Sequence, residues 1–135
     1  MDALFFLARR EDALNVASSD DLPSEPVADA LRIEGPAPLV GLGEILEVER
    51  RARPLRDATC RSFPVWDVGS GITQHIAGLD DDGVDDAAER WWKRHAKSLD
   101  ADLFQIACCL SDLRDAIREG DPGETLFVLL EERAW

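Results

Sequence analysis

The chain contains a run of five apolar residues, Leu126–Leu130, that limits the choice of fold. Side chains alternate between the two faces of a strand, so this strand would be apolar on both faces. Such a strand avoids water on either side and lies inside a sheet that other layers cover. The run Ala3–Ala8 has the same character, and we expect the two strands to be neighbours in the sheet.

Two amphipathic helices are expected before the last strand. Asp82 is the expected N-cap of the first, because Asp85 follows it by three residues in a weak form of the capping box. Trp92 lies at the edge of the apolar face of this helix. That face consists of Val84, Ala87, Ala88, Trp91 and His95.

The second helix is expected to begin after Ser98 or Asp100 and to run to about Arg118. Gly120 follows as a helix stop. Its apolar residues recur at spacings of three and four, and they are Leu103, Ile106, Leu110, Leu113 and Ile117.

The first half of the chain gives weaker signals. Arg9–Pro26 is polar and indicates a loop or a hairpin arm. Val27–Glu34 fits either a helical turn or a strand. A helix is expected to open near Pro38 and to stop before Pro54, although two glycines weaken this prediction.

Two further strands are predicted in the middle of the chain. Phe63–Val68 and Ile72–Ala77 are expected to pair as a hairpin joined by Gly69-Ser70-Gly71. Together these patterns predict one α+β domain spanning residues 1–135. We expect a sheet of about four or five strands packed with about three helices.

Charge is the strongest compositional feature. The chain has 28 acidic and 15 basic residues and a net charge of −13, which disfavours nucleic acid and anionic membranes as partners. Six acids and no base occur in residues 80–89, whereas five arginines occur in residues 50–61. No segment approaches the roughly 20 apolar residues of a membrane span, and the first residues lack the bases of a signal peptide. These features predict a cytoplasmic protein.

The three cysteines do not suggest a disulfide framework. Their number is odd, and Cys108 and Cys109 are adjacent on the expected helix. Neighbouring helical positions point about 100° apart, so we expect one thiol to pack and the other to lie nearer the surface.

The acidic run around Gly83 invites comparison with a calcium-binding loop. Asp80, Asp82 and Glu89 would fit its third, fifth and twelfth positions, but the first position would be Gly78, which has no carboxylate. A solvated helix N-terminus explains the run better. We therefore predict no metal and no cofactor.

A thiol–imidazole site is the alternative that would make the chain an enzyme or a small-ligand domain. Cys60, Asp67 and His75 supply the required groups, which need only meet in space. No local motif surrounds Cys60, so we assign no catalytic residues.

The end of the chain resembles the end of barstar-type inhibitors. The shared features are an amphipathic helix, a glycine, a short acidic turn at Asp121-Pro122-Gly123 and an apolar strand. This arrangement is generic to α/β folds, so no residue role follows from it.

The sequence favours a small acidic protein that binds another protein, as an immunity protein or antitoxin-like inhibitor does. A cleft built for an anionic substrate, such as that of a toxin, also attracts a carboxylate-rich surface. An assembly or accessory protein that uses Trp92 or Trp135 is a further alternative. The expected partner-binding residues are Asp80, Asp81, Asp82, Asp85, Asp86, Glu89 and Trp92.

Overall fold

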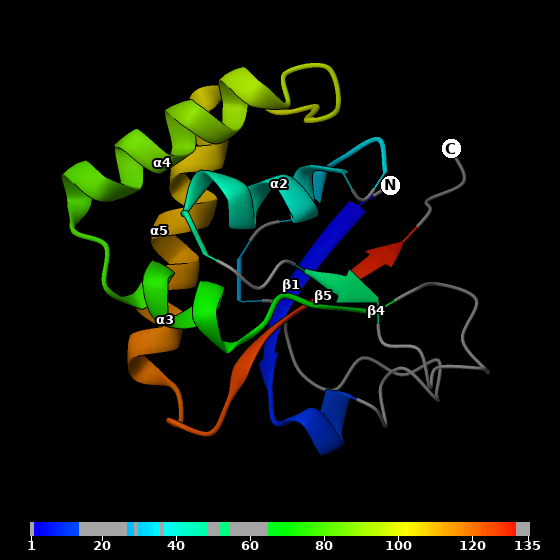
Figure 1. Ribbon diagram of the computed structural model, residues 1–135, viewed down its shortest axis with the longest axis vertical. Coiled ribbons are helices and arrows are strands. Elements are labelled where there is room, and N and C mark those ends of the chain that lie inside the picture. The colour runs from blue at the N-terminus through cyan, green and yellow to red at the C-terminus, as the bar shows by residue number, and fades with distance from the viewer. Residues whose placement is uncertain are drawn as a thin grey trace.

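The computed structural model describes residues 2–13, 27–28, 30–35, 37–48, 52–54 and 65–131. The four helices of eight or more residues in the described ranges lie together on one side of an antiparallel sheet (Figure 1). In chain order the elements are β1 (Asp2–Ala8), β2 (Leu31–Arg32), α2 (Ala37–Ile45), β3 (Arg53–Pro54), β4 (Val65–Asp67), α3 (Ser70–Ala77), α4 (Asp81–Arg94), α5 (Leu103–Glu119) and β5 (Thr125–Glu131). The predicted single α+β domain is confirmed.

The sheet has five strands in the order β2-β1-β5-β4-β3. The central pair, β1 and β5, is antiparallel over seven residue pairs, from Asp2 opposite Glu131 to Ala8 opposite Thr125. The outer strands β2 and β3 have only two residues each. The last strand is therefore central and adjacent to the first, as its two apolar faces predict.

Both faces of the central pair are buried. Phe5 and Val128 pack against the helices in the larger core, whereas Leu4 and Leu129 belong to a second cluster on the opposite face. Ala13, which ends the short helical segment of residues 10–13, joins that second cluster. Phe6 and Phe127, paired across the strands, stack with ring centroids 5.8 Å apart. Each fully buried side chain of this size contributes about 1.5–3 kcal/mol to stability.

The predicted hairpin between Phe63–Val68 and Ile72–Ala77 is wrong. β4 covers Val65–Asp67, but Ile72–Ala77 belongs to helix α3. Gly69, at a φ of +94°, turns the chain from strand to helix, and its N–H donates to the Asp67 carboxylate over 2.9 Å. Ile72 and Ile76 are four residues apart, which places both on the buried face of a helix.

The N-caps of α4 and α5 differ from the predicted ones by two to four residues. Asp80, rather than Asp82, caps α4 and accepts a hydrogen bond from the Gly83 N–H at 2.7 Å. Asp102, rather than Ser98 or Asp100, caps α5 in a capping box with Gln105. The predicted stripe on α5 begins only at Ile106 because Leu103 is 38% exposed.

The first half of the chain contains helix α2 and the short strand β2. The helix near Pro38 is confirmed as α2, and within Val27–Glu34 the strand alternative holds at β2. Beyond β2, the Glu34 N–H donates to the Ser98 carbonyl at 2.8 Å, which ties the sheet edge to the loop after α4. Most of Arg9–Pro26 and the start of Phe63–Val68 lie outside the described residues. No helix in the described ranges is long and apolar enough to cross a membrane.

Candidate protein-binding site

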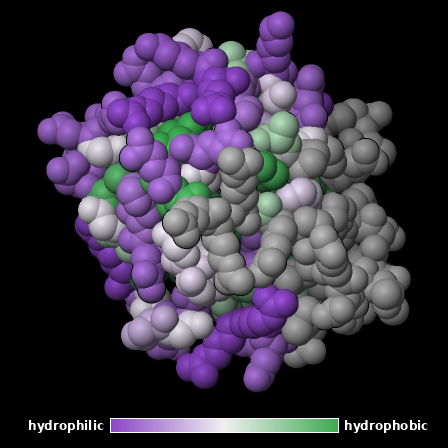
Figure 2. Space-filling view, in the orientation of Figure 1, coloured by the Kyte–Doolittle hydropathy of each residue, from purple (hydrophilic) through white to green (hydrophobic). Residues whose placement is uncertain are grey.

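Helix α4 presents the acidic residues that the sequence singles out. Its apolar positions Val84, Ala87, Ala88 and Trp91 are all buried against the core, so the charged positions of the helix face outward. Figure 2 shows hydrophilic side chains over the part of the surface that α4 occupies in Figure 1. The exposed acids are Asp80, Asp81, Asp82, Asp85, Asp86 and Glu89.

Arg114 of α5 holds the first turn of this acidic segment in place. Its side chain is only 9% exposed, and its guanidinium lies 2.9 Å from the Asp81 carboxylate and 3.3 Å from that of Asp115. The hydrogen bond to Asp81 is the main reason that the pKa of Arg114 is raised. Asp81 therefore has a structural partner inside the protein, which the sequence analysis did not foresee.

A second arginine of α5 fixes the corner between α3 and α4. The Arg118 guanidinium donates to the carbonyls of Ala77 at 2.7 Å and of Leu79 at 2.9 Å. These carbonyls lie at the end of α3, where helical carbonyls lack partners in the helix itself. The acidic start of α4 is thus attached to α5 through two guanidinium groups.

Two of the acids on α4 pair with bases one turn later. Asp86 lies 3.1 Å from Arg90, and Glu89 lies 2.6 Å from Lys93. The hydrogen bond from Lys93, together with its charge, lowers the pKa of Glu89. Such exposed pairs contribute little to stability, but their charges partly neutralise one another.

Asp82 and Asp85 differ from their neighbours. Both are exposed, and neither takes part in an ion pair within the described part of the chain. Asp80, by contrast, is occupied as the helix cap. Of the six predicted acids, Asp82 and Asp85 therefore offer carboxylates without a competing charge partner in this structure.

The opposite end of α4 is attached to α2. The Trp91 indole N–H donates to the Pro38 carbonyl at 2.8 Å, and the Arg94 guanidinium lies 2.5 Å from the Glu44 carboxylate. The His95 imidazole packs against Gly41, and its buried Nε2 has no hydrogen-bond partner among the described residues. Burial lowers the pKa of His95, the Arg94 charge lowers it further, and the Glu44 charge opposes this shift.

Trp92 is less available than the acids. It is half-buried and packs against the main core. The most exposed large apolar side chain among the described residues is Phe104 of α5, at 76%. The sequence analysis missed it because an exposed phenylalanine on a helix leaves no periodic signal. Trp135 lies outside the described residues.

Within the described residues, Asp67 and His75 of the alternative thiol–imidazole site do not contact one another through a hydrogen bond or an ion pair. Asp67 lies 3.3 Å from Arg10 and accepts from the Gly69 N–H, while the exposed His75 lines a shallow cavity beside α4. Cys60 lies outside the described ranges.

The other two thiols lie on α5 as predicted. Cys108 is exposed and Cys109 is buried, and neither forms a disulfide within the described residues. Among these residues, no group of three or more histidines, cysteines or carboxylates could hold a metal ion. Asp80, which fits the third position of a calcium-binding loop in the sequence, is the N-cap of α4 in the structure.

Comparisons of the chain with protein-family models, with curated proteins and with solved structures return no match, so its site is interpreted from its own geometry.

Proposed function

We propose that this protein binds a partner protein through the acidic start of α4 and acts as an immunity or antitoxin-like inhibitor. The partner would carry a basic site, for instance the substrate cleft of a toxin. The observation that carries the proposal is the pair Asp82 and Asp85, which are exposed without an ion pair in the described structure on a helix whose other face is anchored.

The anchoring supports a binding role because it fixes the direction of the carboxylates. Arg114 and Arg118 attach the start of α4 to its neighbours, and the Trp91 indole attaches the middle of the helix to α2. A surface fixed in this way loses little conformational entropy when a partner binds. The net charge of −13 adds long-range attraction toward a basic partner and speeds association.

The experiment compares two charge reversals of equal size. Asp82→Lys/Asp85→Lys changes the proposed face, whereas Glu11→Lys/Asp12→Lys changes the helical segment of residues 10–13, which lies at the far end of the molecule from α4 (Figure 1). Immobilised parent chain retains candidate partners from a host lysate, and association rates are then measured for each purified candidate.

The α4 reversal should slow association by about tenfold at low salt, and the difference should shrink as salt screens the charges. The control reversal should have a much smaller effect because its charges lie away from the contact. Equal association rates for parent and α4 variant at every salt concentration would contradict the proposal.

A further inference from the structure

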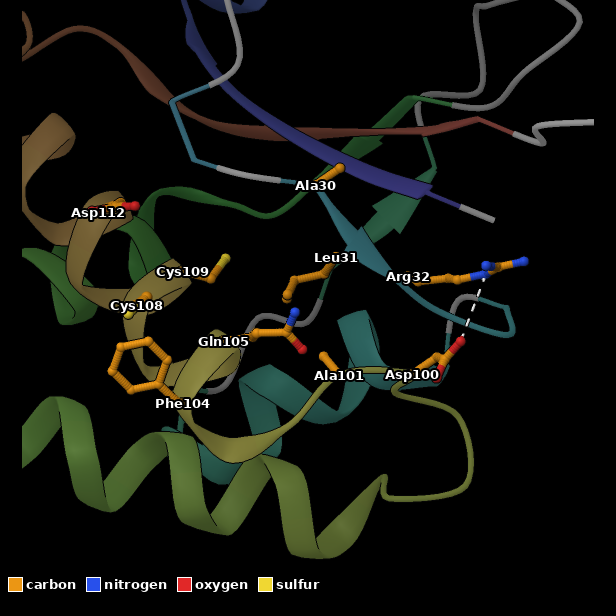
Figure 3. Close-up of a pocket in the computed structure, with 10 residues that line it drawn as sticks. All are labelled: Ala30, Leu31, Arg32, Asp100, Ala101, Phe104, Gln105, Cys108, Cys109 and Asp112. Carbon is orange, nitrogen blue, oxygen red and sulfur yellow. Dashed lines mark ion pairs between the residues drawn. The ribbon is translucent and has the colours of Figure 1, made fainter.

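A cavity of about 310 Å³ lies between α5 and the edge strand β2 (Figure 3). Its floor is apolar, because the buried side chains of Leu31 and Cys109 line it. Gln105 and the exposed thiol of Cys108 lie along the α5 side. The cavity therefore has an apolar floor and a polar wall formed by α5.

Phe104 stands at the rim of this cavity and is 76% exposed. Aromatic side chains, phenylalanine among them, are enriched at protein–protein interfaces relative to the rest of the surface. A ligand confined to the cavity would leave most of this ring in water. The ring therefore indicates an occupant that extends beyond the cavity, which favours a segment of another protein over a small molecule.

The charges at the two ends of the cavity are unequal. At one end Asp100 pairs with Arg32 at 3.7 Å, so their charges largely compensate. At the other end the exposed Asp112 takes part in no ion pair within the described residues. The uncompensated charge beside the apolar floor is thus a carboxylate, and it favours a cationic neighbour.

We propose that this cavity receives one bulky apolar side chain of a partner protein, flanked in the partner by a lysine or arginine that pairs with Asp112. A cavity of about 310 Å³ has room for one bulky side chain, and the choice of a side chain over a small molecule rests on the exposed Phe104 ring. Phe104 covers the inserted side chain from the rim. The inference rests on the proposed binding of a basic partner and adds an anchor point on α5.

The test uses two capped tripeptides as probes, acetyl-Lys-Trp-Lys-amide and acetyl-Glu-Trp-Glu-amide. Binding is followed by shifts of the backbone amide signals of labelled protein. We expect saturable shifts at Leu31, Phe104 and Cys109 with the lysine peptide, and weaker binding of the glutamate peptide. The absence of saturation at about 5 mM lysine peptide, beyond the range of even weak specific contacts, would overturn the inference.

Two exposed substitutions and one control sharpen this test. Phe104→Ala should weaken binding of the lysine peptide by about tenfold, as loss of an anchor does. Asp112→Asn should weaken it by about two- to fivefold, as loss of one exposed ion pair does. Asp121→Asn, which removes an equal charge beyond the end of α5, should leave binding unchanged.

Two results would overturn the inference without touching the proposed function. One is equal affinity for both peptides, or equal affinity for free indole, since either removes the need for a flanking cation. The other is a captured partner whose affinity falls with Asp82→Lys/Asp85→Lys but not with Phe104→Ala. Conversely, peptide binding at the cavity without any partner that responds to the α4 reversal would support the cavity and contradict the inhibitor.

Discussion

Replacing Gly41 by alanine tests the contact between α2 and the end of α4. A methyl group at Gly41 would overlap the His95 imidazole, at 2.5 Å from Cε1 and closer still to Nε2. The imidazole must then leave its site or push the two helices apart. Overpacking of this kind costs about 1–3 kcal/mol.

The same substitution also has a favourable effect. Gly41 lies inside α2, where alanine is more favourable than glycine by about 0.8–1 kcal/mol. The two effects oppose one another, so Gly41→Ala alone should lower the free energy of unfolding by roughly 1 kcal/mol. In a His95→Ala background the overlap is absent, and the same change should raise stability by about 0.5–1 kcal/mol.

Urea denaturation of the four proteins in this cycle measures the coupling directly. We expect a coupling of about 1–3 kcal/mol between the two positions, with similar slopes for all four proteins. The His95 ring signals supply a second readout, because an imidazole expelled into water should regain a pKa close to its ordinary 6.5. A Gly41→Ala effect of the same sign and size in both backgrounds would refute the close contact.

Three further predictions concern the whole domain. Thermal melts with and without reductant should coincide; a lower melting temperature after reduction would reveal a bridge that involves Cys60. The contribution of His95 to the free energy of unfolding should be fully present above pH 6.5 and should fall as the pH drops toward the lowered pKa of His95, because the unfolded chain protonates this imidazole more readily than the folded protein does. In urea titrations, His95→Gln should remove this part of the pH dependence. Asp102→Ala should cost about 1 kcal/mol and lower the melting temperature by about 3–5 °C, whereas Asp100→Ala should have a smaller effect in the same scans.

The sequence predicts elements well where one periodicity is unambiguous. Leu126–Leu130 is apolar at every position, and only a central strand with two covered faces satisfies it. The α4 stripe from Val84 to Trp91 fits only a helix. Ile72–Ala77 is shorter, and its apolar pattern fits both a strand and a helix. Its helical conformation depends on the turn at Gly69 and on the Thr73 hydroxyl, which accepts a hydrogen bond from the Leu126 N–H.

Cap positions were harder to predict because the chain offers acids two residues apart. Asp80 and Asp82 carry the same group, as do Asp100 and Asp102. Which one accepts from the helix amides depends on where the backbone turns, and local sequence does not determine this. The choice bears on the proposed function, since a carboxylate used as a cap is not available to the proposed binding surface.

The candidate sites divide in the same way. The outward direction of Asp82 and Asp85 follows from the helical period alone. The role of Arg114 does not, because it depends on Asp81, which comes from another helix. The cavity is beyond sequence reasoning altogether, since β2 and α5 form it together and are far apart in the chain.

The pairing of β1 with β5 also determines when the domain can be completed during synthesis. Of the residue pairs between β1 and β5, Ala8 and Thr125 are the least separated in sequence, and they still join the first part of the chain to the last. The contacts of α4 with α5 join neighbouring segments of the chain and can form early, while β1 remains without its central neighbour. A strand that is apolar on both faces is meanwhile exposed to chaperones and to other nascent chains. Strand β1 can therefore pair with β5 only after β5 has left the ribosomal exit tunnel.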